Sequence, residues 1–375
     1  MKNYKWIYKN KNYLNTVDYS KLLKFFNSSY DYDLGWEPIP NSRKKESFGN
    51  GNTGFLQFDN YGRRLDPNQK FEESNYVIFG DSYALSRQVG EYETISHYLG
   101  NFLKKYVSNY GVGNYGIDQA FLRYKKYRGS LKGKHIIYIV VPESIVRINT
   151  RWRHLHETGN IFGFKPRFLI DKGNNLITEE NPIKEFSDYE RNFISFINNN
   201  SKLCKDPMYL LRFRDEAINF SNLIKLKSST YHKLLEYLEW LVNRTFLKKI
   251  SDPTGLTIRM KSNARFTNRC YSISETKNLL KKLLLEINSY HKGNVSIFIL
   301  PQLSDLKINN IKRQDYFEDI KEKYNINIFD ATRFLKKEIG STRNAGKLYV
   351  EKGYGGHFNK NGNYLVAQWI KSKIS

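Results

Sequence analysis

The chain has 375 residues and a mass of 44.4 kDa, enough for one large domain or two ordinary ones with a real apolar core. Its 24 Gly and 9 Pro are too few for a collagenous or Pro-rich disordered chain, and 2 Cys exclude a disulfide framework or a cysteine zinc site. The 61 basic and 37 acidic residues give a net charge of +24, which admits nucleic acid, an acidic glycan or a membrane surface as partner without choosing among them.

The chain carries no signal for membrane insertion or export. Its longest clear apolar run, Ile136 to Val141, is far shorter than the about 20 residues of a membrane helix. The first residues, Met1-Lys2-Asn3-Tyr4-Lys5-Trp6, are basic but lack the apolar segment that follows in a secretion signal. We therefore expect a cytoplasmic protein with no transmembrane segment.

Residues 1–70 are expected to form an irregular arm, because their short aromatic patches are broken by Asn, Gly, Pro and charged residues. After it, apolar runs of strand length alternate with helices that repeat apolar residues on one face. We expect a strand at 75–79, a helix at 92–106, a strand ending near 112, a helix at 118–127 and a strand at 135–141. The pattern returns with a helix at 274–290, a strand at 294–300, a helix at 308–324, a strand at 326–329 and a helix at 362–373.

This alternation indicates the fold class. Uniformly apolar strands between amphipathic helices are typical of a parallel sheet covered on both faces. Residues 71–150 and 265–375 are therefore expected to form one α/β domain. Residues 151–264 show loop and helix patterns without a clear strand, so we expect a mainly helical insertion there.

Residues that can carry chemistry follow the expected strands, and ligands of open parallel sheets bind at these carboxyl ends. Gly80-Asp81-Ser82 follows the first strand, a Gly-rich turn at 111–116 follows the second, and Pro142-Glu143-Ser144 ends the third. His357 stands just before the last helix. A serine at a strand-to-helix turn, a neighbouring Gly-rich turn and a late histidine indicate serine acyl chemistry.

These motifs resemble those of the SGNH (GDSL-like) hydrolases, in the order that the superfamily has them. Gly80-Asp81-Ser82 with Ser86 matches the first motif, the segment from Asn109 to Gln119 is similar to the second, and the segment from His357 to Asn363 is similar to the last. The resemblance covers roughly 70–150 and 265–375. It implies a flavodoxin-like three-layer αβα fold, in a divergent branch similar to carbohydrate O-acyl esterases and acetyltransferases.

The resemblance also implies roles for single residues. Ser82 is expected to be the nucleophile, with its own amide as one oxyanion donor, and His357 the general base. Aligning Asn109 with the conserved Asn of the superfamily puts the second oxyanion amide at Asn114, where Gly is usual. Asn tolerates the required φ better than most residues, and Gly113 is the alternative. No metal and no cofactor are expected; His154 and His156 lack nearby Cys or spaced carboxylates.

Two positions depart from the motifs. Glu143 stands where the superfamily has an Asn that donates to the oxyanion, and Tyr354 stands where it usually has the Asp that orients the histidine. His357 then acts in a dyad, or another acid orients it. Glu143, Glu351 and Asp330 are candidates, and we favour Glu143 because its position should lie beside Ser82.

Basic residues are expected both at the site and away from it. Arg147, Arg151 and Arg153 follow the third strand at its catalytic end, and Arg forks pair with carboxylate or phosphate groups. We group them with Asp81 as substrate-binding residues, although Asp81 is expected to form the turn rather than to act as a catalytic acid. The basic residues between 123 and 134 lie at the opposite end of the sheet and are expected to be a solvated face.

The sequence thus predicts hydrolysis or transfer of an O-acyl ester through an acyl-Ser82 intermediate. The expected substrate is an acetylated, in some cases acidic, carbohydrate, a class implied only by the resemblance. Three alternatives stay open: a lipid or small-ester hydrolase, a non-catalytic protein that keeps the fold and binds glycan or another polyanion, and a nucleic-acid binder. No recognised nucleic-acid motif supports the last.

Overall fold

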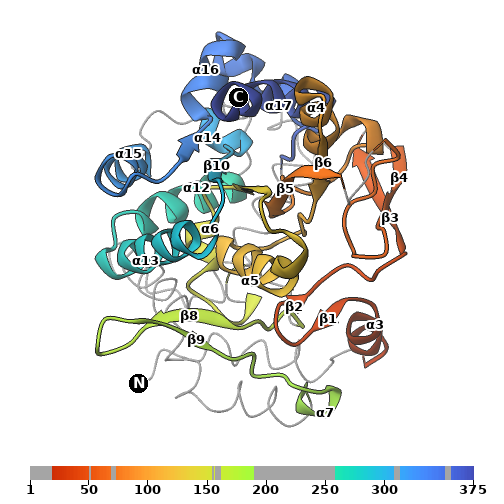
Figure 1. The fold of residues 1–375 in the computed structure, drawn as a ribbon, viewed down its shortest axis with the longest axis vertical. Helices are drawn as coiled ribbons and strands as arrows, with labels where there is room; N and C mark the ends of the chain where they lie inside the picture. Colours follow the sequence, from red (N-terminus) through yellow and green to blue (C-terminus); the bar gives the residue numbers. More distant parts are fainter. Residues whose placement is uncertain are drawn as a thin grey trace. The chain divides into compact units, whose positions relative to one another are not determined.

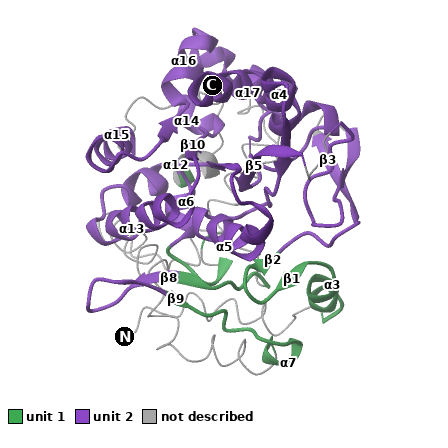
Figure 2. Cartoon of the chain, viewed as in Figure 1, with its two compact units in different colours: residues 1–36, 149–167, 178–263 green, residues 37–148, 168–177, 264–375 purple. Residues whose placement is uncertain are grey.

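The computed structural model of the chain describes residues 19–49, 52–68, 73–153, 156, 162–189, 258–307, 313–350 and 356–375. The chain divides into two compact units (Figure 2). Unit 1 consists of residues 1–36, 149–167 and 178–263, and unit 2 of residues 37–148, 168–177 and 264–375. Ser82 and His357 both belong to unit 2.

Unit 2 contains a five-stranded sheet with the strand order β11-β10-β7-β5-β6. Figure 1 labels β10, β5 and β6 of this sheet. Each neighbouring pair is parallel, so the predicted parallel sheet is confirmed. The strands are β5 (Ser74–Gly80), β6 (Tyr106–Asn109), β7 (His135–Val140), β10 (Val295–Ile299) and β11 (Ile328–Asp330). β5 is an interior strand, so its Gly80 end, where the first motif begins, lies between the ends of β7 and β6 at the carboxyl edge.

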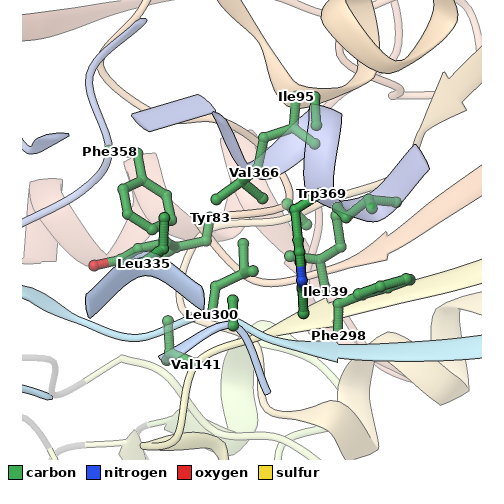
Figure 3. Close-up of a cluster of buried hydrophobic side chains, with 14 of the residues drawn as sticks. Tyr83, Ile95, Ile139, Val141, Phe298, Leu300, Leu335, Phe358, Val366 and Trp369 are labelled. Atoms are coloured by element: carbon green, nitrogen blue, oxygen red, sulfur yellow. The ribbon is translucent and has the colours of Figure 1, made fainter. Parts of the chain in front are cut away.

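Successive residues of a strand point to opposite faces of the sheet, so these apolar strands give the sheet two apolar faces. Helices cover both of them. On one face a buried apolar cluster joins the strands to α4 (Ile95–Leu103) and α17 (Lys360–Ile374); it includes Ile139, Phe298, Ile95, Val366 and Trp369 (Figure 3). On the other face Phe79 meets Tyr124 of α5 (Ile117–Tyr127) edge-on, with ring centroids 5.7 Å apart. The structure is thus an α/β layer fold around a parallel sheet.

Most expected elements of unit 2 are found near their predicted bounds, and α13 (Ser274–Tyr290) has the predicted ones. Of the helix expected at 308–324, α15 (Arg313–Tyr324) forms the described part, since residues 308–312 lie outside the described residues. The preceding short helix α14 (Leu303–Lys307) was not expected. Neither α16 (Thr332–Ile339) nor the 3₁₀ helix at Thr342–Leu348 was expected, because their few apolar residues stand among basic ones. The remaining short elements are α6 (Ser144–Arg147), α12 (Ile258–Cys270) and the 3₁₀ turns Glu91–Glu93 and Arg128–Ser130.

Residues 1–70 were expected to form an irregular arm, and the structure corrects this expectation, because residues 19–57 contain a helix and four strands. These are α3 (Tyr19–Ser29), the antiparallel pair β1 (Tyr30–Asp31) and β2 (Gly35–Trp36), and the hairpin of β3 (Arg43–Gly49) and β4 (Asn52–Gln57). The hairpin escaped prediction because most of its described side chains are polar and only Glu46 and Leu56 are buried, so it has no apolar run.

The segment expected as a mainly helical insertion contains strands. Its described part holds β8 (Arg167–Ile170) and β9 (Leu176–Glu179), which form a two-stranded sheet, and the short helix α7 (Phe186–Asp188). Residues 190–257, most of the expected insertion, lie outside the described residues. Among the described helices, none is long and apolar enough to cross a membrane.

Candidate active site

The chain turns sharply after β5 and brings Ser82 to the carboxyl edge of the sheet. Gly80 has φ of 153°, and a Cβ there would lie 1.8 Å from the carbonyl oxygen of Ile139, so only glycine fits. Asp81 closes the turn: its Oδ1 accepts from the amide of Tyr83 at 2.8 Å and its Oδ2 from the amide of Val141 at 2.8 Å. The next residue, Ser82, is therefore held at the start of the loop.

Asp81 is a structural residue, which corrects its grouping with the substrate-binding residues. The side chain is fully buried, and both carboxylate oxygens are engaged by backbone amides. Burial raises the pKa of Asp81, while the nearby Arg147 guanidinium and the two amides act in the opposite direction. The turn thus depends on a buried carboxylate whose two oxygens are both bound by backbone amides.

His357 reaches Ser82 across the edge of the sheet. Its Nε2 lies 2.8 Å from Ser82 Oγ. The segment that carries it is fixed on both sides: the amide of Val350 donates to the carbonyl of His357 at 2.9 Å, and Asn359 caps α17 by accepting from the amides of Asn361 and Gly362. The structure therefore brings together the two residues predicted to be nucleophile and base.

Tyr83, which directly follows Ser82, also positions the histidine. Its hydroxyl donates to the carbonyl of Gly356 at 2.5 Å, and its ring centroid lies 5.3 Å from that of His357. Gly356 has φ of 68°, which glycine adopts without strain. The loop after the serine thus holds the backbone in front of the histidine.

The other ring nitrogen of His357 contacts a side-chain amide. Nδ1 lies 2.8 Å from Oε1 of Gln88, a residue only 2% exposed. When the amide oxygen faces the ring it can only accept, so in that arrangement Nδ1 carries the proton and Nε2 presents its lone pair to the Ser82 hydroxyl. This is the tautomer that a general base for Ser82 needs.

Glu143, the acid favoured to orient His357, is hydrogen-bonded to two other side chains, and its orienting role stays a prediction. Its Oε2 accepts from Arg147 Nη2 at 3.1 Å and from Gln302 Nε2 at 3.4 Å. Arg147 stands one helical turn further on, where it captures the carboxylate. Of the other candidates, Asp330 accepts from Arg313 Nε at 2.9 Å, while Glu351 and Tyr354 lie outside the described residues.

Arg147 links the three turns at the edge of the sheet, which corrects its expected role as a substrate-binding residue. Its Nη1 donates to the carbonyl of Tyr115 at 2.8 Å and lies 3.6 Å from Asp81 Oδ2, and its Nη2 pairs with Glu143. The guanidinium is 8% exposed and is used within the protein. One buried cation therefore compensates two carboxylates beside Ser82.

Arg151 and Arg153 belong to unit 1, where both contact other residues of that unit. Arg151 Nη1 lies 2.7 Å from Glu179 Oε1, and the Arg153 guanidinium lies 5.7 Å from the ring centroid of Trp36. Their binding of substrate stays a prediction.

The Gly-rich turn after β6 packs directly on the loop that carries Ser82. Asn109 Nδ2 donates to the carbonyl of Ala84 at 2.8 Å, and its Oδ1 accepts from the amide of Gly111 at 2.9 Å. A Cβ on Gly111 would lie 2.3 Å from the amide nitrogen of Leu85. Close backbone contact between the two turns thus requires glycine at position 111.

Both expected oxyanion donors have suitable backbones. In the described part of the chain the Ser82 amide donates to no carbonyl or side-chain acceptor. Asn114 has φ of 73°, so it holds the left-handed conformation that its alignment with the usual Gly requires. Gly113 is not among the residues with positive φ. The roles of Ser82, Asn114 and Gly113 in binding an oxyanion stay predictions.

Sequence reasoning missed Gln88 and the linking role of Arg147. The search for a partner of His357 considered only acids, and nothing in the sequence distinguishes Gln88 from other polar loop residues. Its spacing of six residues from Ser82 has no regular period, because the loop between them is neither helix nor strand. Arg147 had a usable signal, since its separation of four residues from Glu143 predicts an ion pair on a helix.

Comparison of the chain with protein-family models gave no match, and comparison with the curated proteins gave none either. The functional interpretation therefore depends on the motifs and on the geometry around Ser82.

Proposed function

We propose that the protein is a serine-dependent O-acyl ester hydrolase or acyltransferase of the SGNH type. One observation carries the proposal: Ser82 Oγ lies 2.8 Å from Nε2 of His357, within hydrogen-bond reach of a general base. Ser82 also stands at the carboxyl end of a central strand of a parallel sheet, where α/β proteins bind ligands.

The reaction follows from these positions. Ser82 Oγ attacks the ester carbonyl carbon while its proton passes to Nε2 of His357, and the Ser82 amide stabilises the oxyanion. When the carbon–oxygen bond to the alcohol breaks, the imidazolium returns the proton to the departing alcohol oxygen. Water, or the hydroxyl of a second alcohol, then attacks acyl-Ser82, and His357 takes that proton and returns it to Ser82.

The substrate class has weaker support than the chemistry. An acetylated carbohydrate is implied by the resemblance to SGNH hydrolases, and the net charge of +24 favours acidic glycans among them. The cytoplasmic location expected from the sequence stays a prediction. A non-catalytic binding protein is the alternative that the same experiment tests.

Hydrolysis of p-nitrophenyl acetate by purified protein tests the proposal. Ser82→Ala should abolish hydrolysis, and His357→Asn should lower kcat by about 10²–10⁴-fold because the base is lost. Ser130→Ala is the matched control, since that exposed hydroxyl donates to the carbonyl of Tyr127, in the same turn. Hydrolysis that survives in Ser82→Ala would contradict the proposal, and binding of acidic glycan without any turnover would support the non-catalytic alternative.

A further inference from the structure

The β3–β4 hairpin is attached to the loop that carries Ser82, residues 81–90, which we call the nucleophile loop. Arg87 belongs to this loop, and its backbone amide donates to the carbonyl of Ser82 at 3.0 Å. The guanidinium of Arg87 binds both carboxylate oxygens of Glu46 on β3, at 2.7 and 3.1 Å. Leu56 of β4 packs in a buried apolar cluster with Leu85 of the same loop. One face of the hairpin therefore lies against the nucleophile loop.

The strand register separates the side chains of the hairpin into two faces. Glu46 and Leu56 are buried, so they define the face that is turned to the nucleophile loop. Because successive strand residues point to opposite faces, Arg43, Lys45 and Phe55 lie on the other one, the outer face. There Lys45 pairs with Phe55, and all three side chains are exposed.

Phe55 supports the guanidinium of Arg43 on this outer face. Arg43 Cζ lies 3.4 Å from the centroid of the Phe55 ring. Stacking uses the flat side of the guanidinium and leaves its N–H donors, which lie in the plane, to other partners. In the described part of the chain, no oxygen atom accepts a hydrogen bond from Arg43. Arg43 is therefore oriented in advance to bind a planar anion such as a carboxylate.

The charge of the outer face is positive. It carries Arg43 and Lys45, whereas the acid within the described hairpin, Glu46, is turned to the nucleophile loop and is paired there. Glu91, which borders the hairpin, accepts from Gln57 at 3.2 Å. Two exposed cations beside one exposed ring therefore make the outer face complementary to an anionic ligand.

We propose that the outer face of the hairpin binds an acidic glycan, with a uronate carboxylate on the guanidinium of Arg43 and a second positive charge from Lys45. That this glycan carries the ester cleaved at Ser82 rests on the proposed function. A nucleic acid fits less well, because single strands stack several bases on free aromatic faces, and Phe55 already carries Arg43. The hairpin also has no amphipathic helix with which to enter an anionic membrane surface.

Isothermal titration of the full chain with oligogalacturonate at low salt tests the proposal, with a neutral dextran oligomer as the control ligand. Arg43→Ala should weaken binding about tenfold, because it removes a charge-assisted, forked contact. Phe55→Leu should weaken binding about threefold, because the guanidinium loses its support. Since Phe55 acts through Arg43, the variant Arg43→Ala/Phe55→Leu should bind no more weakly than Arg43→Ala.

Arg128→Ala is the matched control, because Arg128 is an exposed arginine that also lies over a ring, 5.3 Å from the centroid of Tyr290. It should leave the affinity unchanged. Binding by Arg43→Ala within about twofold of the wild type, or additive losses in the double variant, would overturn the proposal. Binding of a DNA oligonucleotide or of phosphatidylserine vesicles in place of oligogalacturonate would overturn it too. A dimer that dissociates in Arg43→Ala would show that a second copy covers this face, with the same consequence.

Hydrolysis of p-nitrophenyl acetate separates a failure of this inference from a failure of the proposed function. Hydrolysis that depends on Ser82, without binding of oligogalacturonate, would refute the inference alone. Binding that depends on Arg43, without any hydrolysis, would support the binding surface and refute the proposed function.

Discussion

Replacement of Arg147 by methionine should destabilise unit 2 and disturb the site together. Methionine keeps most of the aliphatic stem but removes the guanidinium that contacts Tyr115, Glu143 and Asp81. The variant leaves two carboxylates in a largely buried position, with Asp81 fully buried. Breaking a buried ion pair by removing one partner costs about 3–5 kcal/mol, and we expect a loss of this size in the free energy of unfolding.

A second substitution separates charge from packing. In Glu143→Gln/Arg147→Met only Asp81 stays uncompensated, so the double variant should recover about 1–2 kcal/mol relative to Arg147→Met alone. Urea unfolding of the wild type, both single variants and the double variant gives the coupling energy. A loss below about 1 kcal/mol in Arg147→Met, or strict additivity of the two changes, would refute the reasoning. Ester hydrolysis should fall equally for anionic and neutral substrates, because Arg147 binds the protein and not the substrate.

Two further predictions test the turn contacts and the pH dependence of stability. Gly111→Ala should lower both stability, by about 1–3 kcal/mol, and hydrolysis, because the new Cβ would press on the backbone of the Ser82 loop; Gly129→Ala, whose Cβ would meet nothing within 4 Å, should change neither. Burial, with His291 nearby, lowers the pKa of His135 to about 4. The contribution of neutral His135 to the free energy of unfolding is therefore fully present above the unfolded pKa of about 6.5. It is lost as pH falls toward 4, by up to about 2 kcal/mol for this partly buried ring. A melting temperature whose acid dependence is unchanged in His135→Gln would contradict this.

The parallel sheet could be predicted because its strands are buried on both faces and are therefore continuously apolar, as at residues 135–141. The β3–β4 hairpin was missed because most of its described side chains are polar and form no apolar run; the Asn50-Gly51 pair between its strands is the local signal that could have found it. Ser82 and His357 could be placed since short motifs fix them at strand and helix ends.

The residues that surround Ser82 and His357 could not be predicted from the sequence. Gln88 and His357 are 269 residues apart in the sequence, and only the folded structure brings them together. Glu143 was expected beside His357 because its position in the motif suggested it, and its carboxylate forms a local ion pair with Arg147 that was not expected. Proximity at one edge of a sheet could be predicted, whereas the choice of partner among several polar groups depends on the folded geometry.

Peptide mapping by mass spectrometry after reaction with a fluorophosphonate tests the central claim most directly. The account predicts one adduct per chain, located on Ser82 and absent from Ser82→Ala, with a rate that falls strongly in His357→Asn. An adduct on another residue while Ser82 stays unmodified, or no adduct at all on folded protein, would contradict it.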